Sequence, residues 1–247
     1  MGTRFDLLLI GPGPAAAGRL WTGIAAELER LDGMLNRFEP ASEVSRINAG
    51  ASRAPVAVSP EMAEILRLCA AYYDSTERLF DVTLRDFSRV AFPAPRSVSF
   101  GGASLTLDFG GFAKGYALRK IGATLREAGA RSAFADFGNS SILGIGRHPY
   151  GACWKVSLPN PCTQQTLDEF GLENRALSTS GNTARHNGHI VNPQTGVYDT
   201  ELKLAAVAAD DPLDAEVLST VRMIAGSRQW ERIARNFGNM QATLYTL

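Results

Sequence analysis

The sequence predicts an α+β fold. Amphipathic helical patterns come early in the chain, short strand-like segments punctuated by Gly, Pro and Asn fill the middle, and a helical pattern returns near the end. This order is not the regular strand–helix alternation of a parallel α/β sheet, so an α+β arrangement is favoured. We expect one large mixed domain over residues 1–247, because no repeat, low-complexity tract or linker divides the chain.

The first part of the chain is predicted to be mainly helical. Between Pro14 and Asn36, apolar residues recur three and four positions apart, which is the spacing of an amphipathic helix. Serine before a helix and proline in its first turn are typical helix starts, and Ser59-Pro60 has this form. The predicted elements are a strand over 5–10 and helices over 14–36, over 42–48 with Ser42 as its cap, and from Ser59 onward.

The middle of the chain is predicted to be rich in strands. Two short strands around Gly101-Gly102 are expected to pair as a hairpin over 97–109. A helix over 112–128 follows, with small and apolar residues facing inward. The remaining predicted elements are strands over 132–137, 140–145, 153–158, 167–172, 176–179, 203–209 and 240–246, and helices over 211–225 and 228–236.

Charge and composition limit the classes of protein to which this chain can belong. Lys plus Arg equals Asp plus Glu at 25 each, so no electrostatic footprint for nucleic acid or an anionic membrane is present. No apolar run reaches membrane-spanning length. The three cysteines, Cys69, Cys153 and Cys162, cannot all pair, so reduced thiols are predicted. Asp6 interrupts the short apolar run near the start, so we expect a cytoplasmic chain as given, or a periplasmic one if an export signal has been removed.

Two Asp-Phe-Gly triplets, at 108–110 and 136–138, raise the possibility of a protein kinase. A kinase also needs a Gly-rich loop, a lysine in a VAIK-like strand and an HRD-type catalytic loop, and the sequence has none of them.

A second pattern, "GPGPAAAGRL" (11–20), nearly matches a nucleotide phosphate loop. Arg19 and Leu20 replace its lysine and metal-binding hydroxyl, so a turn and helix start is the better interpretation.

The segment "DFGGFAKG" (108–115) is a candidate phosphate site. Asp108 ends a strand, and Gly110 and Gly111 let the backbone turn and approach a ligand closely. The next helix presents free N–H groups, and Lys114 adds positive charge, which suits a phosphate or pyrophosphate. A plain strand–turn–helix with a surface lysine explains the pattern equally well.

Two further patterns carry candidate chemistry. Glu216 and Thr220 lie four residues apart and so project from one helix face as hard oxygen ligands suited to Mg²⁺. The alternative is an exposed glutamate and a threonine bonded to its own helix.

His186 and His189 lack the further ligands that a zinc site needs. His189 is a candidate general base because histidine titrates near neutrality, and a solvated loop histidine is its alternative.

Eight segments, taken in their order and spacing, are similar to one family. They are "MGT" (1–3), "RFEPASEVSRIN" (37–48), "FDVTL" (80–84), "LDFGGFAKGYA" (107–117), "DFGNSSILGIG" (136–146), "LSTSGN" (177–182), "GHIVNPQTG" (188–196) and "AEVLSTV" (215–221). Together they resemble the FAD:protein FMN transferases, the ApbE-like flavin transferases. The resemblance covers nearly the whole chain and implies a T-fold-related architecture with helices flanking an antiparallel sheet.

The resemblance also implies a reaction and a set of site residues. Members of this family take FAD and Mg²⁺ and move FMN onto a threonine or serine hydroxyl of an acceptor protein, releasing AMP. By analogy His189 is the base, and Glu216 and Thr220 hold the metal with a backbone carbonyl near Gly111. The implied FAD site consists of Met1 and Phe38 beside the adenine, Asp108 at the adenosine end, Gly111, Phe112, Ala113 and Lys114 against the flavin nucleotide, and Ser180 and Gly181 beside the pyrophosphate.

The sequence departs from the family pattern at three places, and two other functions remain open. Glu216 stands where aspartate is more usual, Phe38 stands where many members have tyrosine, and "FGNSS" replaces a double-glycine form. One alternative function is an FAD pyrophosphatase, in which water replaces the acceptor hydroxyl and gives FMN and AMP. The other is a catalytically inactive FAD-binding protein.

Overall fold

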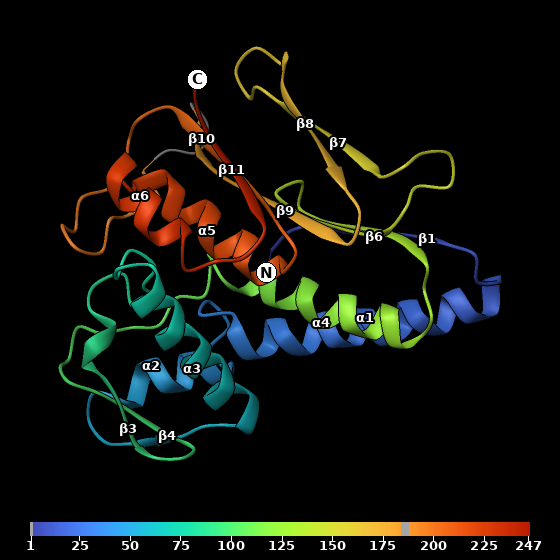
Figure 1. The fold of residues 1–247 in the computed structure, drawn as a ribbon. Helices are drawn as coiled ribbons and strands as arrows, with labels where there is room; N and C mark the ends of the chain where they lie inside the picture. Colours follow the sequence, from blue (N-terminus) through green and yellow to red (C-terminus); the bar gives the residue numbers. More distant parts are fainter. Residues whose placement is uncertain (1, 184–187) are drawn as a thin grey trace.

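A six-stranded antiparallel sheet is the centre of the computed structural model, which describes residues 2–183 and 188–247 (Figure 1). Each strand runs antiparallel to its neighbours, so the predicted α+β class is confirmed. The strands in spatial order are β1 (Phe5–Ile10), β5 (Ser132–Phe137), β6 (Ser141–Gly146), β9 (Arg175–Asn182), β10 (Lys203–Ala209) and β11 (Met240–Thr246).

Helices cover one face of this sheet. Successive side chains of a strand point to opposite faces, and the helix-facing set is mostly apolar, as in Leu7, Ala135 and Val207 of the main core. Helices α4 and α5 lie on this face, and α1 packs beside α4 (Figure 1). The helices are α1 (Pro14–Leu35), α4 (Ala113–Glu127), α5 (Pro212–Ile224) and α6 (Ser227–Ala234).

The opposite face of the sheet is covered by a two-stranded arm, β7 (Trp154–Pro159) with β8 (Thr166–Leu172). Trp154 and Phe170 of the arm are buried against Ile142 and Leu177 of the central sheet in a separate apolar cluster. The same strands therefore bury residues on both faces, and the arm rises above the sheet at the upper right of Figure 1.

A second group of elements occupies the lower left of Figure 1. The predicted helix caps are confirmed there, because the Ser42 side chain accepts a hydrogen bond from the Ser45 N–H and the Ser59 side chain accepts one from the Met62 N–H. The group consists of α2 (Glu43–Gly50), α3 (Pro60–Ser75), the 3₁₀ turn η1 (Phe87–Arg89) and a small sheet in the order β2 (Val56–Ala57), β4 (Ser97–Phe100) and β3 (Val90–Ala94).

The predicted hairpin over 97–109 is wrong. Residues Ser97–Phe100 form β4, which pairs with β2 and β3, and residues 105–109 are not a strand. Leu105, Leu107 and Phe109 are buried, as an alternating strand pattern predicts. Their backbone is instead held by other partners, because the Asn48 side chain bonds to Leu107 and the Asp108 N–H donates to the Val82 carbonyl. The other predicted elements are present within a few residues, and β9 is longer than expected.

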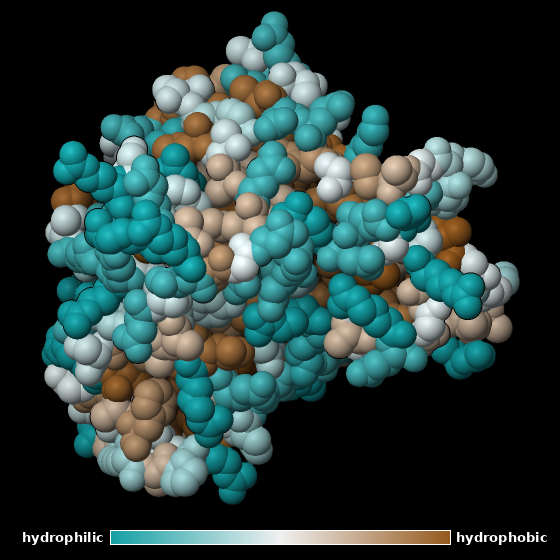
Figure 2. All heavy atoms as spheres, viewed as in Figure 1, coloured by the Kyte–Doolittle hydropathy of each residue, from teal (hydrophilic) through white to brown (hydrophobic). Residues whose placement is uncertain are grey.

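The surface combines polar regions with apolar patches. Figure 2 shows hydrophilic residues over much of the visible face and a brown patch at the lower left, where Figure 1 places β3 and β4. Phe92 of β3 is 45% exposed and contributes to the apolar surface of this region. Within the two described ranges, no helix is both long and apolar enough to span a bilayer.

Candidate active site

Helices α4 and α5 meet in close contact near the start of α4. Asp211 caps α5 by accepting from the Leu213 N–H at 2.9 Å, and Arg119 of α4 donates two hydrogen bonds to the same carboxylate. Gly115 of α4 lies directly against α5, since a Cβ on this residue would be 2.5 Å from the Glu216 Cβ. A glycine at this position therefore lets the two helices bring their functional side chains together.

Lys114 and Glu216 form a largely buried ion pair at this contact. The Lys114 Nζ lies 2.6 Å from Glu216 Oε1, and it also donates to the Ser141 Oγ at 2.6 Å. The Glu216 side chain is 4% exposed and that of Lys114 is 21% exposed. Buried charges are costly unless they are paired and hydrogen-bonded, and here each charge has such partners.

A chain of hydroxyl groups continues from this pair. The Glu216 Oε2 accepts from Ser141 at 2.5 Å and from Ser178 at 2.8 Å. The Ser178 hydroxyl lies 3.2 Å from that of Ser219. The Ser180 hydroxyl lies 2.8 Å from that of Ser219 and 3.4 Å from that of Thr220. The ion pair is thus linked through hydrogen bonds to Thr220, one turn further along α5.

Thr220 and Gly111 form a corner at the mouth of this network. A Cβ on Gly111 would be 3.2 Å from the Thr220 Oγ1, so the hydroxyl rests against the glycine backbone. The first turn of α4 begins immediately after this corner and has no side-chain cap. Uncapped N–H groups at a helix start favour an anion.

The corner offers oxygen donors of the kind that Mg²⁺ binds. Mg²⁺ keeps several waters and takes few protein ligands beside substrate phosphates. The Thr220 hydroxyl and the neighbouring Gly111 carbonyl are oxygen donors of the required type. In the described part of the chain, no group of three or more His, Cys, Asp or Glu side chains forms a metal cluster.

Asp108, Arg37 and Phe38 lie together beside the corner. The Asp108 Oδ1 accepts from the Gly110 N–H at 2.9 Å, and its Oδ2 lies 3.2 Å from the Arg37 Nε. The Arg37 guanidinium lies 4.7 Å from the centre of the Phe38 ring, which is 80% exposed. An exposed aromatic ring next to a carboxylate and a guanidinium can bind a planar polar ring.

Phe112 and Ala113 are buried, which limits how they can act. The Phe112 ring is fully buried and packs on the rings of Phe80, Phe109 and Tyr116, with centroids 6.4, 5.9 and 5.6 Å away. Ala113 is 7% exposed. The contribution of Phe112 predicted from the sequence therefore has to come from its backbone, because its side chain belongs to the core.

Ser180 and Gly181 lie at the end of β9 that faces α5. Ser180 belongs to the hydroxyl chain and so points toward Thr220. Gly181 allows close packing on β10, because a Cβ there would be 2.6 Å from the Leu204 Cδ1. Ser180 thus lies at the edge of the same centre, whereas Gly181 faces Leu204, which belongs to the apolar cluster on the arm side of the sheet.

His189 is exposed and lies on the connection between β9 and β10. The next residue, Ile190, is buried in a small cluster with Met223, which lies one turn beyond Thr220 on α5. Gln194 further along this connection donates to the Glu77 carbonyl at 2.6 Å. The segment that carries His189 is therefore anchored beside the site. Met1 and His186 lie outside the described residues.

Sequence reasoning missed three members of the network, Ser141, Ser178 and Ser219. Ser141 and Ser178 occupy strand positions that face the helices, where neighbouring strands place apolar residues. Polar residues at buried strand positions are a usable signal, because a buried hydroxyl needs a partner. Nothing local to Lys114 indicates its pairing with Glu216, which is 102 residues away.

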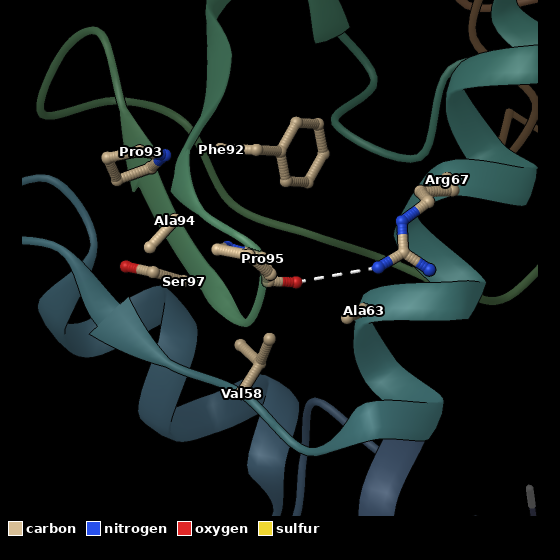
Figure 3. A pocket seen from close by; sticks show the side chains of 8 residues that line it. All are labelled: Val58, Ala63, Arg67, Phe92, Pro93, Ala94, Pro95 and Ser97. Carbon is tan, nitrogen blue, oxygen red and sulfur yellow. Dashed lines mark hydrogen bonds between the residues drawn. The ribbon is translucent and has the colours of Figure 1, made fainter.

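Two pockets lie away from this centre, and none of the predicted site residues lines either of them. One of about 390 Å³ is lined by Phe92, Pro93, Ala94 and Pro95 near β3, with Arg67 of α3 across from them (Figure 3). The Arg67 guanidinium donates to the Pro95 carbonyl at 3.4 Å. The other, of about 410 Å³, lies between the central sheet and the β7–β8 arm.

The chain matches the model of one protein family, described as the ApbE family, over residues 1–97 and 84–244. A curated relative from Salmonella typhimurium, named FAD:protein FMN transferase, is 21% identical over 96% of this chain and 80% of its own length. A relative of the same name from Rhodobacter capsulatus is 30% identical over 55% of this chain and 27% of its own length. The family resemblance of the sequence is confirmed.

Solved structures of flavin transferases share the fold. The apo form of the Pseudomonas stutzeri flavinyl transferase ApbE superposes with a TM-score of 0.84 at 22% identity, over 100% of this chain and 88% of that one. The flavin transferase ApbE from Vibrio cholerae gives a TM-score of 0.86 at 20% identity, over 100% and 91%. These likenesses confirm the predicted arrangement of helices around antiparallel sheets.

Proposed function

We propose that this chain, which belongs to the ApbE family, transfers FMN from FAD to a serine or threonine hydroxyl of an acceptor protein and releases AMP. The observation that carries the proposal is the meeting of α4 and α5. It gathers Lys114, Gly111 and Thr220 into one centre, with Asp108 and His189 on neighbouring segments. This centre combines a cation, an uncapped helix start and oxygen donors, which together suit a pyrophosphate.

In the proposed reaction, the acceptor hydroxyl oxygen attacks the FMN-side phosphorus of FAD. A new P–O bond to the acceptor forms, the P–O bond to AMP breaks, and AMP leaves as an anion. The hydroxyl proton passes to a base, for which His189 is the candidate. A threonine hydroxyl is a poor nucleophile at neutral pH, so a base within hydrogen-bond reach contributes about 10²–10⁴-fold to the rate.

The remaining site residues bind and orient FAD in this proposal. Asp108 and Phe38 border the adenosine end, together with Met1. Lys114, Ser180 and Gly181 lie along the pyrophosphate, and the backbone from Gly111 to Ala113 lies against the flavin nucleotide. Mg²⁺, when bound at the Gly111–Thr220 corner, neutralises the charge that grows on the leaving phosphate oxygen. Positioning and fixed charges supply most of the rate in such transfers.

The test is a reaction of the pure protein with FAD and Mg²⁺, with and without a peptide that carries an acceptor threonine. AMP release and the mass of the peptide are measured together, with EDTA and a peptide with alanine in place of threonine as controls. We expect a mass gain equal to FMN that both controls abolish. AMP without a mass gain would indicate the pyrophosphatase, and bound FAD without any AMP would indicate an inactive flavin-binding protein.

A further inference from the structure

The Glu216 carboxylate accepts hydrogen bonds from three protein donors. Oε1 accepts from Lys114, and Oε2 accepts from both Ser141 and Ser178, at distances of 2.5 to 2.8 Å. A carboxylate has about four lone-pair sites, so three of them are in use. The side chain is 4% exposed, which leaves it almost no contact with solvent.

These surroundings do not suit a direct metal ligand. A Mg²⁺ ion requires near-octahedral geometry and keeps several waters, which need open space around the ligand atom. The only carboxylate oxygen with a lone pair to spare, Oε1, has an ammonium group 2.6 Å away. A divalent cation on that oxygen would be repelled by the charge of Lys114.

The same contacts hold Lys114 in one place. An ammonium group has three N–H donors. Glu216 and Ser141 accept two of them, and the Lys114 side chain is 21% exposed, so its remaining donor can reach a ligand. A glutamate, one methylene longer than aspartate, can extend from α5 to reach both the lysine on α4 and the serines of β6 and β9.

We infer that Glu216 is a positioning residue for Lys114 and not a metal ligand, and that a divalent cation is held by Thr220, the Gly111 backbone and the FAD pyrophosphate. The inference rests on the proposed function, because the pyrophosphate belongs to its substrate. The cation then enters the site with FAD, and the free protein binds it weakly. The Lys114–Glu216 pair contributes a fixed positive donor next to the phosphates.

The test uses Mn²⁺ as the divalent cation. Its affinity for the protein is measured with and without FAD, from the decrease in the electron paramagnetic resonance signal of free Mn²⁺. The decisive variant combines Glu216→Gln with Lys114→Met, which removes both charges of the pair and keeps the net charge of the site. Thr220→Val is the matched variant that removes a proposed ligand. FAD is added to a concentration at which flavin fluorescence shows the site filled in each variant, and thermal melting confirms that each variant is folded.

We expect the double variant to keep the Mn²⁺ affinity of the FAD complex within about threefold, and Thr220→Val to lose at least about tenfold. A larger loss in the double variant, or a smaller one in Thr220→Val, would overturn the inference. The unmodified protein gives a second measurement that needs no variant. Its Mn²⁺ affinity should be at least about tenfold weaker without FAD, because water then replaces the phosphate ligands, and an equal affinity would overturn the inference.

Failure of the inference and failure of the proposed function give different results. A protein that attaches FMN to the acceptor peptide but loses Mn²⁺ in the double variant contradicts only the role given to Glu216. A protein that does not bind FAD, or whose FAD complex does not bind Mn²⁺, contradicts the inference as well as the proposed cofactor use.

Discussion

The side-chain amide of Asn48 hydrogen bonds to both backbone groups of Leu107, which lies 59 residues further along the chain. Its Oδ1 accepts from the Leu107 N–H at 2.7 Å, and its Nδ2 donates to the Leu107 carbonyl at 3.0 Å. One side chain of α2 thus supplies the hydrogen bonds that a partner strand would supply. The backbone just before Asp108 is fixed in this way.

Substitution of Asn48 should therefore affect both stability and FAD binding. Asn48→Ala leaves the two backbone groups of Leu107 without a partner, which costs about 1–3 kcal/mol of unfolding free energy. We also expect weaker FAD binding, because Asp108 follows directly. Urea denaturation and FAD titration measure the two effects. Asn48→Asp keeps the acceptor and loses the donor, so an intermediate stability is expected, and unchanged stability of the alanine variant would contradict the prediction.

A methyl group at Gly115 should separate α4 from α5. The new Cβ would lie 2.5 Å from the Glu216 Cβ and 2.8 Å from the Pro212 carbonyl, so Gly115→Ala is expected to cost about 1–3 kcal/mol and to lower FMN transfer. Gly23→Ala on α1 is the matched control. No atom lies within 4 Å of its new Cβ, so helix propensity should raise stability by up to about 1 kcal/mol. Equal effects of the two substitutions would be inconsistent with this packing.

Replacement of Phe112 should lower the stability of the protein, whereas replacement of Phe38 should weaken FAD binding. Phe112→Ala empties a fully buried position and is expected to cost about 3–5 kcal/mol of unfolding free energy. Phe38→Ala removes an 80% exposed ring and should leave stability nearly unchanged while weakening FAD binding. Thermal melting and FAD titration of the two variants test the contrast. The prediction does not hold if Phe38→Ala destabilises the protein as much as Phe112→Ala does.

The ionised side chain of Glu27 should stabilise the folded protein at neutral pH and lose this effect in acid. Two hydrogen bonds from Arg30 lower the pKa of Glu27 to about 2, against the opposing effect of partial burial, and Lys120 adds to the lowering. Because the folded pKa lies below the unfolded value of 4.5, the contribution is complete above about pH 4.5 and is lost as the pH falls toward 2. The Glu27 side chain is partly exposed to solvent, which screens the interaction, so Glu27→Gln should cost about 0.5 kcal/mol at neutral pH.

Denaturation of the unmodified protein and of Glu27→Gln at pH 7 and pH 3 measures this difference. We expect the gap in unfolding free energy to shrink at the lower pH, since the carboxylate is then largely protonated in the unfolded chain. A gap that stays constant across this range would show that Glu27 does not act through its charge.

His189→Ala should reduce FMN transfer without preventing FAD binding. The loss of a general base is expected to lower the rate by about 10²–10⁴-fold. FAD affinity should change little, because the proposed contacts with FAD come from other residues. Single-turnover AMP release and flavin fluorescence separate the two quantities. A variant with full activity would remove His189 from the mechanism.

Local sequence patterns determined most of the secondary structure and the family of this chain. The helix starting at Ser59-Pro60 and the amphipathic helix from Pro14 both depend on contacts within a few residues of sequence, so spacing alone predicts them. The segments around Asp108 and Glu216 could likewise be identified as candidates, because glycine corners and oxygen ligands are local features. The resemblance to the ApbE family rests on the order of such segments.

Only the tertiary structure decided how these residues act on one another. The hairpin expected over 97–109 does not form, because the partners of Leu107 and Asp108 are Asn48 and Val82, which no local pattern connects. Local patterns mark Lys114 and Glu216 as two separate candidate ligands, and only the packing of α4 against α5 shows that their charges form a pair. Such pairing depends on packing between elements far apart in sequence, whereas helix caps and periodicity depend only on neighbouring residues.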